Sequence, residues 1–160
     1  MYRKATLADF DFAYEMYMHP IINPHLLYEQ MSADDFKPIF EKLIATDIFY
    51  LYEENNEPVG MFKLIPQTFR SAHVAYLGSF AIDPTFAGKG LGTKMLLSII
   101  ELAKQTGIKR IELSAGVQNA KAIALYKKCG FEEEGVLRKF THFKSEDRYI
   151  DEMMMSYIIE

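Results

Sequence analysis

Three glycines at alternate positions, Gly88, Gly90 and Gly92, lie between a predicted strand end and a predicted helix start. Glycine lets backbone N–H groups approach an anion with no side chain in the way. A helix N-terminus adds unpaired donors and about half a positive charge. With Lys89 and Lys94 beside them, these glycines predict a phosphate-binding loop.

Two common phosphate loops fit this segment poorly. A Walker A loop needs Gly-Lys followed by Ser or Thr, whereas Lys89 is followed by Gly90. A dinucleotide fingerprint gains support from Gly88, Gly90 and Glu112, but Thr93 replaces its third glycine and Glu112 falls inside a strand. A loop that merely turns a corner is the remaining alternative, although three alternate glycines are a costly way to make a turn.

A second block of residues gives the loop a more specific interpretation. The run Phe80–Pro84, the loop Gly88–Gly92 and the block Asn119–Phe131 together resemble the GCN5-related N-acetyltransferase (GNAT) family. The resemblance is strongest over residues 73–131, and the element order extends it to the whole chain. It implies an acyltransferase that moves an acetyl group from acetyl-CoA directly to a primary amine.

The resemblance also implies where the cofactor binds. The pantetheine arm pairs with the strand before the loop, and the pyrophosphate lies over the loop. Asn119 both caps its helix and touches pantetheine, while Lys121 approaches a phosphate. Ala87 stands where the family usually has Gln or Arg, so only backbone donors remain there. The cofactor-binding residues are then Phe80, Ala81, Ile82, Ala87, Gly88, Lys89, Gly90, Leu91, Gly92, Thr93, Asn119 and Lys121.

Tyr126 is the candidate general acid. It lies seven residues after Asn119, two helical turns along one face, and the family's equivalent tyrosine protonates the coenzyme A sulfur. The alternative is a tyrosine that packs at the helix–sheet boundary. Backbone N–H groups at the end of the 73–82 strand are suited to polarise the carbonyl.

The general base is left open. An alkylamine with a pKa of about 10.4 is protonated at pH 7, so a base or a water chain must remove its proton. Glu112, His73 and the acids at 132–134 are nominees, each with a solvated strand position as the alternative. Ser114 stands where some relatives have a base Glu, which leaves room for a water relay. Cys129 has no evident His partner, so direct attack fits better than a covalent intermediate.

The acceptor is predicted less sharply. Residues 73–78 and 138–154 also resemble the bacterial branch that acetylates small amines and amino acids. The irregular segment 20–31 and the hairpin 138–150 should wall the acceptor pocket, which would take a small-molecule amine or a peptide N-terminus. Aromatic residues that either line this pocket or belong to the core are Tyr17, Tyr28, Phe140, Phe143 and Tyr149. The alternative functions are a dinucleotide-dependent oxidoreductase and a non-catalytic acyl-CoA sensor. The resemblance to the family also makes a homodimer a possible assembly.

The elements that position these residues follow from periodicity and caps. Thr6 with Asp9 and Ser32 with Asp35 give capping-box-like helix starts. The order β-α-α-β-β-β-α-β-α-β-β predicts an α/β (α+β) fold: one domain over 1–160 with a mixed, mostly antiparallel sheet and helices on both faces. Expected helices are 7–18, 33–45, 90–106 and 119–129; expected strands are 2–5, 48–53, 59–66, 73–82, 109–115 and two more after 131.

Charge and composition exclude several classes of function. The chain has 160 residues and a formal charge of −4. This net negative charge argues against a nucleic-acid partner, which would require a basic surface. Residues 84–128 carry eight Lys or Arg and two acids, a net +6 that leaves −10 elsewhere. That division suits an anionic cofactor and a cationic acceptor. The lone Cys129 excludes an internal disulfide and a zinc ribbon, and we expect no metal. With no apolar leader or membrane span, we expect a cytoplasmic protein.

Overall fold

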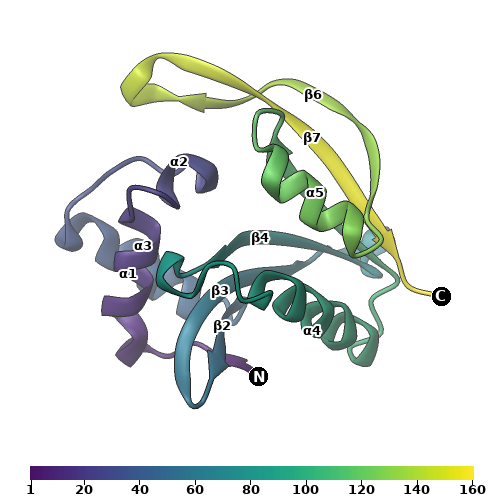
Figure 1. Cartoon of the computed structure of the whole chain (residues 1–160), viewed down its shortest axis with the longest axis horizontal. Coiled ribbons are helices and arrows are strands. Elements are labelled where there is room, and N and C mark those ends of the chain that lie inside the picture. The colour runs from purple at the N-terminus through teal and green to yellow at the C-terminus, as the bar shows by residue number, and fades with distance from the viewer.

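Alternating apolar residues build a seven-stranded sheet in the computed structural model, which describes residues 1–160 (Figure 1). The strands are β1 (Tyr2–Lys4), β2 (Phe49–Glu54), β3 (Glu57–Pro66), β4 (Val74–Ile82), β5 (Arg110–Gly116), β6 (Glu132–Phe143) and β7 (Arg148–Ile158). The α-helices are α1 (Phe10–Met18), α2 (Asn23–Leu26), α3 (Ala33–Ala45), α4 (Leu91–Gln105) and α5 (Ala120–Lys128).

The order of the strands across the sheet is β1-β2-β3-β4-β5-β7-β6. Every neighbouring pair is antiparallel except β4 and β5, which run parallel and are joined through α4. The predicted mixed, mostly antiparallel sheet is therefore confirmed. The single parallel pair lies in the middle of the sheet, and the glycine loop follows the C-terminal end of β4.

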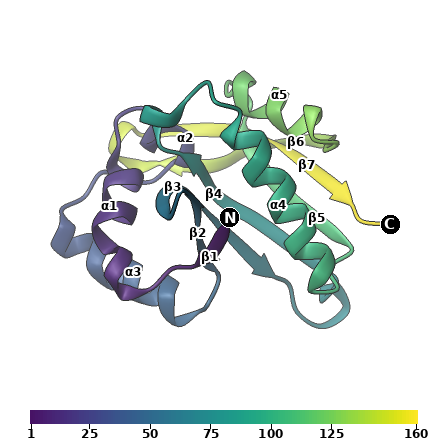
Figure 2. The ribbon, with the colours of Figure 1, turned by 60° about the horizontal axis from the view of Figure 1, so that its bottom comes forward.

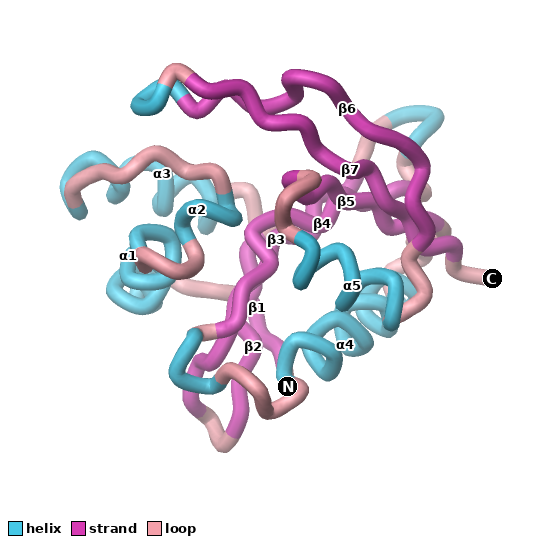
Figure 3. Tube along the Cα trace, turned by 45° about the horizontal axis from the view of Figure 1, so that its top comes forward, coloured by secondary structure: helices cyan, strands magenta, loops and turns pink.

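Helices cover both faces of the sheet, as predicted. Figures 2 and 3 show α1 and α3 on one side of the strands and α4 and α5 on the other. Two apolar cores result. The core under α4 and α5 includes Met95, Leu96, Ile99, Leu113 and Tyr126. The core under α1 and α3 is rich in aromatic rings and includes Tyr17, Phe36, Phe40, Phe49 and Leu51.

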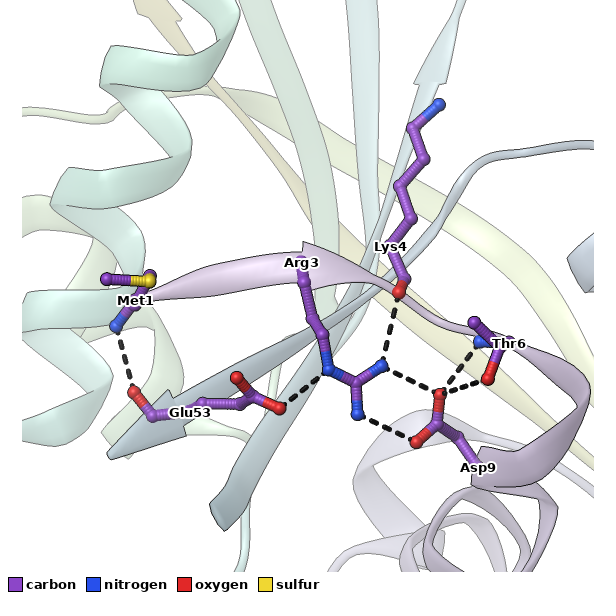
Figure 4. Close-up of polar contacts among 6 residues, drawn as sticks. All are labelled: Met1, Arg3, Lys4, Thr6, Asp9 and Glu53. Atoms are coloured by element: carbon purple, nitrogen blue, oxygen red, sulfur yellow. Dashed lines mark hydrogen bonds and ion pairs between the residues drawn. The ribbon is translucent and has the colours of Figure 1, made fainter. Parts of the chain in front are cut away.

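Arg3 joins the first strand to its neighbours (Figure 4). Its Nε donates to Glu53 on β2 at 2.6 Å, and its two terminal nitrogens each donate to Asp9 at 2.8 Å. Asp9 also accepts from the Thr6 N–H at 2.7 Å, which confirms the predicted start signal. Hydrogen bonding from Arg3 lowers the pKa of Asp9. This bidentate contact fixes the entry into α1, which carries part of the candidate site.

The structure departs from the sequence prediction in the segment 20–31. The sequence predicts an irregular segment here, but the structure contains the short helix α2, which ends at Leu27 in the left-handed region (φ 59°). The buried Asn23 side chain stabilises this turn by donating to the carbonyls of Tyr17 and Tyr28, at 2.8 and 2.9 Å. The helix predicted over 7–18 starts as a 3-10 turn at Leu7–Asp9, with α1 beginning at Phe10, and the other element ends differ from prediction by at most two residues. None of the helices combines the length and the apolar character needed to cross a membrane.

Candidate active site

The glycine loop between β4 and α4 presents a row of unpaired backbone donors. The N–H groups from Gly88 to Thr93 donate to no acceptor in the protein, because the first helical bond of this turn runs from Lys94 to Gly90. Gly88 and Gly90 have φ values of 78° and 72°, the left-handed region that favours glycine. Consecutive donors around such residues form an anion-binding concavity.

Gly92 has a different role in the same loop. A Cβ at this position would lie 3.2 Å from Leu125 Cδ2, so glycine lets the start of α4 approach α5 closely. Lys89 and Lys121, both exposed, take part in no ion pair, and Lys89 lies 5.0 Å from the Phe86 ring centroid. Lys89 therefore brings positive charge without an internal partner to the loop.

Before the chain reaches this loop, β4 and β5 separate. They pair only where Val74, Ala75 and Tyr76 face Arg110, Ile111 and Glu112. We call the unpaired remainder, Leu77–Ile82 of β4 and Leu113–Gly116 of β5, the fork. Since β4 pairs with β3 along its other edge up to Ile82, the backbone of Phe80, Ala81 and Ile82 has one edge turned toward the fork. An extended chain could add there as a strand adds to a sheet.

A β-bulge lies in the fork. Met61 pairs with Ala81 but Lys63 pairs with Gly78, so one residue of β3 opposes both Ser79 and Phe80. Ser79 has φ 48°, and the hydroxyl of Tyr17, a buried residue of α1, donates to the Ser79 Oγ at 2.6 Å. A bulge re-aims the local N–H groups. No local signal predicts this bulge, since nothing marks Ser79 as a residue of positive φ.

The helix α5 brings Tyr126 against the fork. Asn119 accepts a hydrogen bond from the Ala122 N–H at 3.3 Å, which confirms the predicted cap. The ring of Tyr126 packs 5.8 Å from Phe80 and from Phe131, centroid to centroid. Burial, with a smaller contribution from Tyr76, raises the pKa of Tyr126 well above its ordinary value.

The Tyr126 hydroxyl is free to act on a ligand. It takes part in no hydrogen bond within the protein, whereas every fully enclosed side-chain oxygen or nitrogen has a partner. The hydroxyl therefore opens onto accessible space. Its raised pKa keeps it protonated at neutral pH, so it could donate to a sulfur or an oxygen in the fork.

The other face of the sheet carries a chain of hydroxyls that ends on a buried carboxylate. The Tyr76 hydroxyl lies 2.8 Å from Ser114 Oγ, which donates to Glu152 Oε1 at 3.1 Å. Thr141 donates to the other oxygen of Glu152 at 2.6 Å. These contacts link β4, β5, β7 and β6. Glu152 is 6% exposed and has no ion-pair partner.

Gly78 separates Tyr76 from a lysine on this face. A Cβ at Gly78 would lie 3.3 Å from Lys63 Cε and 3.5 Å from Tyr76 Cε1, so both side chains lean over the glycine. The Lys63 ammonium lies 3.3 Å from the Tyr28 hydroxyl and has no acidic partner. An unpaired cation and a buried carboxylate thus belong to one face of the sheet.

The two segments predicted to wall an acceptor pocket face each other. Residues of α2 and of the β6–β7 turn line a cavity of about 270 Å³, and Glu29 accepts from the Ser145 N–H at 3.1 Å. The five aromatic candidates divide. Tyr17 is core, Phe143 lines the cavity and Tyr28 contacts Lys63, whereas Phe140 and Tyr149 are more than half exposed on the hairpin.

The nominated bases are otherwise engaged. Arg110 pairs with Glu112 and Glu134, and its hydrogen bonds lower the pKa of Glu134 to about 2. Glu133 pairs with Lys127 at 2.6 Å, and Glu132 is exposed at the start of β6. His73 is exposed and precedes β4, at the end of that strand away from the fork. The sequence missed Glu152, whose only signal was its place on the same strand face as Ile150 and Ser156.

Comparison with known proteins identifies relatives across most of the chain. The acetyltransferase (GNAT) family matches residues 10–131. An uncharacterized N-acetyltransferase of Methanocaldococcus jannaschii is 37% identical over 95 residues. The matched region covers 58% of this chain and 42% of that relative's length. The L-amino acid N-acetyltransferase AaaT of Escherichia coli K12 is 29% identical over 149 residues, 90% of this chain and 85% of its own.

Solved structures share the fold. Spermidine N-acetyltransferase from Vibrio cholerae, in complex with CoA and spermine, superposes with a TM-score of 0.85 at 23% identity, covering 99% of this chain and 94% of its own. An acetyltransferase from Salmonella typhimurium with acetyl-CoA superposes with a TM-score of 0.77 at 21% identity. The superposition covers 100% of this chain and 94% of the Salmonella typhimurium chain.

Proposed function

The chain belongs to the acetyltransferase (GNAT) family, whose co-substrate is acetyl-CoA, and from that premise we propose that it acetylates the primary amine of a small molecule or a peptide N-terminus. One observation carries the proposal: the unpaired edge of β4 in the fork leads, through the short turn Pro84–Phe86, to a loop of unpaired N–H groups. An extended arm attached to a pyrophosphate matches both features at once.

The residues around the fork supply the parts of a direct transfer. Phe80, Ala81 and Ile82 hold the pantetheine arm, and the loop from Ala87 to Thr93 holds the pyrophosphate. Backbone N–H groups at the Ser79 bulge polarise the thioester carbonyl. As the carbon–sulfur bond breaks, Tyr126 gives its proton to the sulfur. Burial raises the pKa of the Cys129 thiol, which disfavours the thiolate that a covalent route would need.

Among primary amines, the unpaired Lys63 favours an acceptor that also carries a carboxylate, as an amino acid does. A half-buried ammonium without an acidic partner attracts an anion more strongly than a solvated one. The relative in Escherichia coli is an L-amino acid N-acetyltransferase, in keeping with this preference. The dinucleotide alternative loses its support, because only β4 and β5 run parallel and dinucleotide folds are built on mostly parallel sheets.

Two measurements on the whole chain test the proposal. Thermal shift with acetyl-CoA, CoA and NADH should give stabilisation by the first two only. A thiol-release assay with acetyl-CoA and a panel of L-amino acids, spermidine and an alanine-initiated peptide should then give turnover with at least one amine. Binding without thiol release would make the chain an acyl-CoA sensor, and no shift with acetyl-CoA would end the proposal.

The preference for a carboxylate has its own test. Lys63→Met should raise the KM for amino acids about tenfold or more, because it removes the only unpaired cation beside Gly78, and should leave acetyl-CoA binding unchanged. Lys104→Met, an exposed lysine near the end of α4, is the matched control. An equal loss with spermidine, which has no carboxylate, would contradict the assigned role of Lys63.

A further inference from the structure

The buried carboxylate of Glu152 has no structural partner that accounts for its charge. It is the only side chain of a charged type among the buried residues, and no Lys, Arg or His pairs with it. Taking a carboxylate out of water without a cation is costly, and only Ser114 and Thr141 compensate here, through hydroxyl hydrogen bonds. Such a group is a candidate for function.

The hydrogen bonds that reach Glu152 all point the same way. Ser114 has one hydroxyl proton, and it is donated to Glu152. Its contact with Tyr76 must then be one in which the tyrosine donates and the serine accepts. The two protons are therefore directed from Tyr76 through Ser114 toward Glu152. The lone pairs of the Tyr76 oxygen are left to accept a proton from a ligand.

This chain of hydroxyls begins where the reaction would take place. Tyr76 forms the last residue pair between β4 and β5, with Glu112, and its ring leans over Gly78 toward the diverging strands. Ser114 lies on the unpaired part of β5, so the Tyr76–Ser114 bond crosses the base of the fork. Tyr126 approaches the fork from the other face of the sheet.

We propose that Glu152 is the final proton acceptor for the acceptor amine, through Ser114 and Tyr76. The inference rests on the proposed acetyl transfer. The ammonium transfers one proton to the Tyr76 oxygen, while Tyr76 passes its own proton to Ser114 and Ser114 passes its own to Glu152, which becomes a neutral acid. The freed nitrogen lone pair then attacks the thioester carbon. Tyr76 is the catalytic residue that touches the amine, and Ser114 and Glu152 are positioning residues.

The protons balance over the whole reaction. The nitrogen loses two protons on the way to an amide. The first passes along the relay to Glu152, which releases it to solvent after product leaves. The second leaves the tetrahedral adduct and restores the hydroxyl of Tyr126, which has protonated the departing thiolate. No oxidant or further co-reactant is required.

The test compares two acceptors that differ in protonation. Ethylamine is almost wholly protonated at neutral pH, whereas the nearly isosteric O-methylhydroxylamine is not, so only ethylamine needs the relay. Glu152→Gln, which keeps the shape and an acceptor for Ser114, should lose at least about 100-fold in kcat/KM with ethylamine. With O-methylhydroxylamine it should stay within about fivefold of wild type. Acetyl-CoA affinity should not change.

Two serines on the same face give the matched pair of variants. Ser114→Ala interrupts the relay and should repeat the selective loss with ethylamine. Ser156→Ala removes a buried hydroxyl that donates to Glu134 at 2.8 Å, outside the relay, and should affect both acceptors alike and weakly. The relay would be overturned if Glu152→Gln lost kcat/KM equally with the two acceptors, or if it lost no kcat/KM with either. If wild type turns over no acceptor at all, the proposed acetyl transfer itself fails.

Discussion

Replacing Tyr126 by Phe removes one oxygen and little else. The hydroxyl makes no hydrogen bond in the protein, so none is lost, and the ring keeps its contacts with Phe80 and Phe131. The free energy of unfolding should therefore change by less than about 1 kcal/mol. Acetyl-CoA should still stabilise the variant against heat, because the loop and the β4 edge are untouched.

Turnover should fall far more than stability. General acid catalysis is worth about 10²- to 10⁴-fold, which corresponds to about 3 to 5 kcal/mol of the activation barrier. The burial that raises the pKa of Tyr126 also penalises a free thiolate in the same place. Without the hydroxyl, the carbon–sulfur bond must break with no proton available.

The pH dependence of this loss sharpens the test. Because the pKa of Tyr126 is raised above its ordinary value near 10, its hydroxyl stays protonated throughout the usual assay range. The ratio of wild-type to variant kcat should therefore be constant from about pH 7 to 9. Steady-state thiol release at saturating acetyl-CoA measures it, with thermal shift as the check on binding.

Tyr157→Phe is the matched control. Tyr157 belongs to the same aromatic cluster, 5.5 Å from Phe131, but lies on β7 outside the fork. Loss of its hydroxyl should leave kcat unchanged. An unchanged kcat in Tyr126→Phe, or an equal loss in both variants, would refute the assignment of Tyr126 as the acid.

Three further predictions concern the loop, the bulge and the first strand. Gly90→Ala should cost about 1 kcal/mol of stability, because φ is 72° while space for a Cβ is open, and should weaken acetyl-CoA binding; an unchanged denaturation midpoint would contradict this. Tyr17→Phe should cost about 1 kcal/mol in urea unfolding by removing the bond to Ser79. Arg3→Met should reduce the difference in unfolding free energy between pH 7 and pH 3. Because Arg3 lowers the pKa of Asp9, the ionised Asp9 stabilises the fold above about pH 4, and this contribution is lost as the pH falls. An undiminished difference in the variant would argue against that coupling.

Local signals were enough to predict most of the fold. Ser32 accepts from the Asp35 N–H at 3.1 Å, and the helix it caps has the predicted bounds, Ala33–Ala45. The loop glycines and the cap at Asn119 also lie where the sequence placed them. These features depend on neighbours within a few residues, which is the range that periodicity and capping rules cover.

Features that depend on distant strands escaped prediction. The fork exists because β5 leaves β4 after Glu112, and the Ser79 bulge is held by a hydroxyl from α1. Glu152 alternates with apolar residues, but its burial results from strands β5 and β6 on either side. The sequence therefore predicted the glycine loop and the candidate acid, whereas Tyr76, Ser114 and Glu152 come together only when the strands β4, β5 and β7 assemble.

The fork also gives this sheet more edges than its strand count suggests. An open sheet has two, here β1 and β6, but the unpaired parts of β4 and β5 add two inner ones. Unpaired strand edges recruit other extended chains and promote aggregation. The inner pair is short and is covered on one face by α4 and α5, which restricts what can enter. Occupancy by acetyl-CoA would cap these inner edges, so co-substrate concentration should govern the shelf life of the purified enzyme as well as its rate.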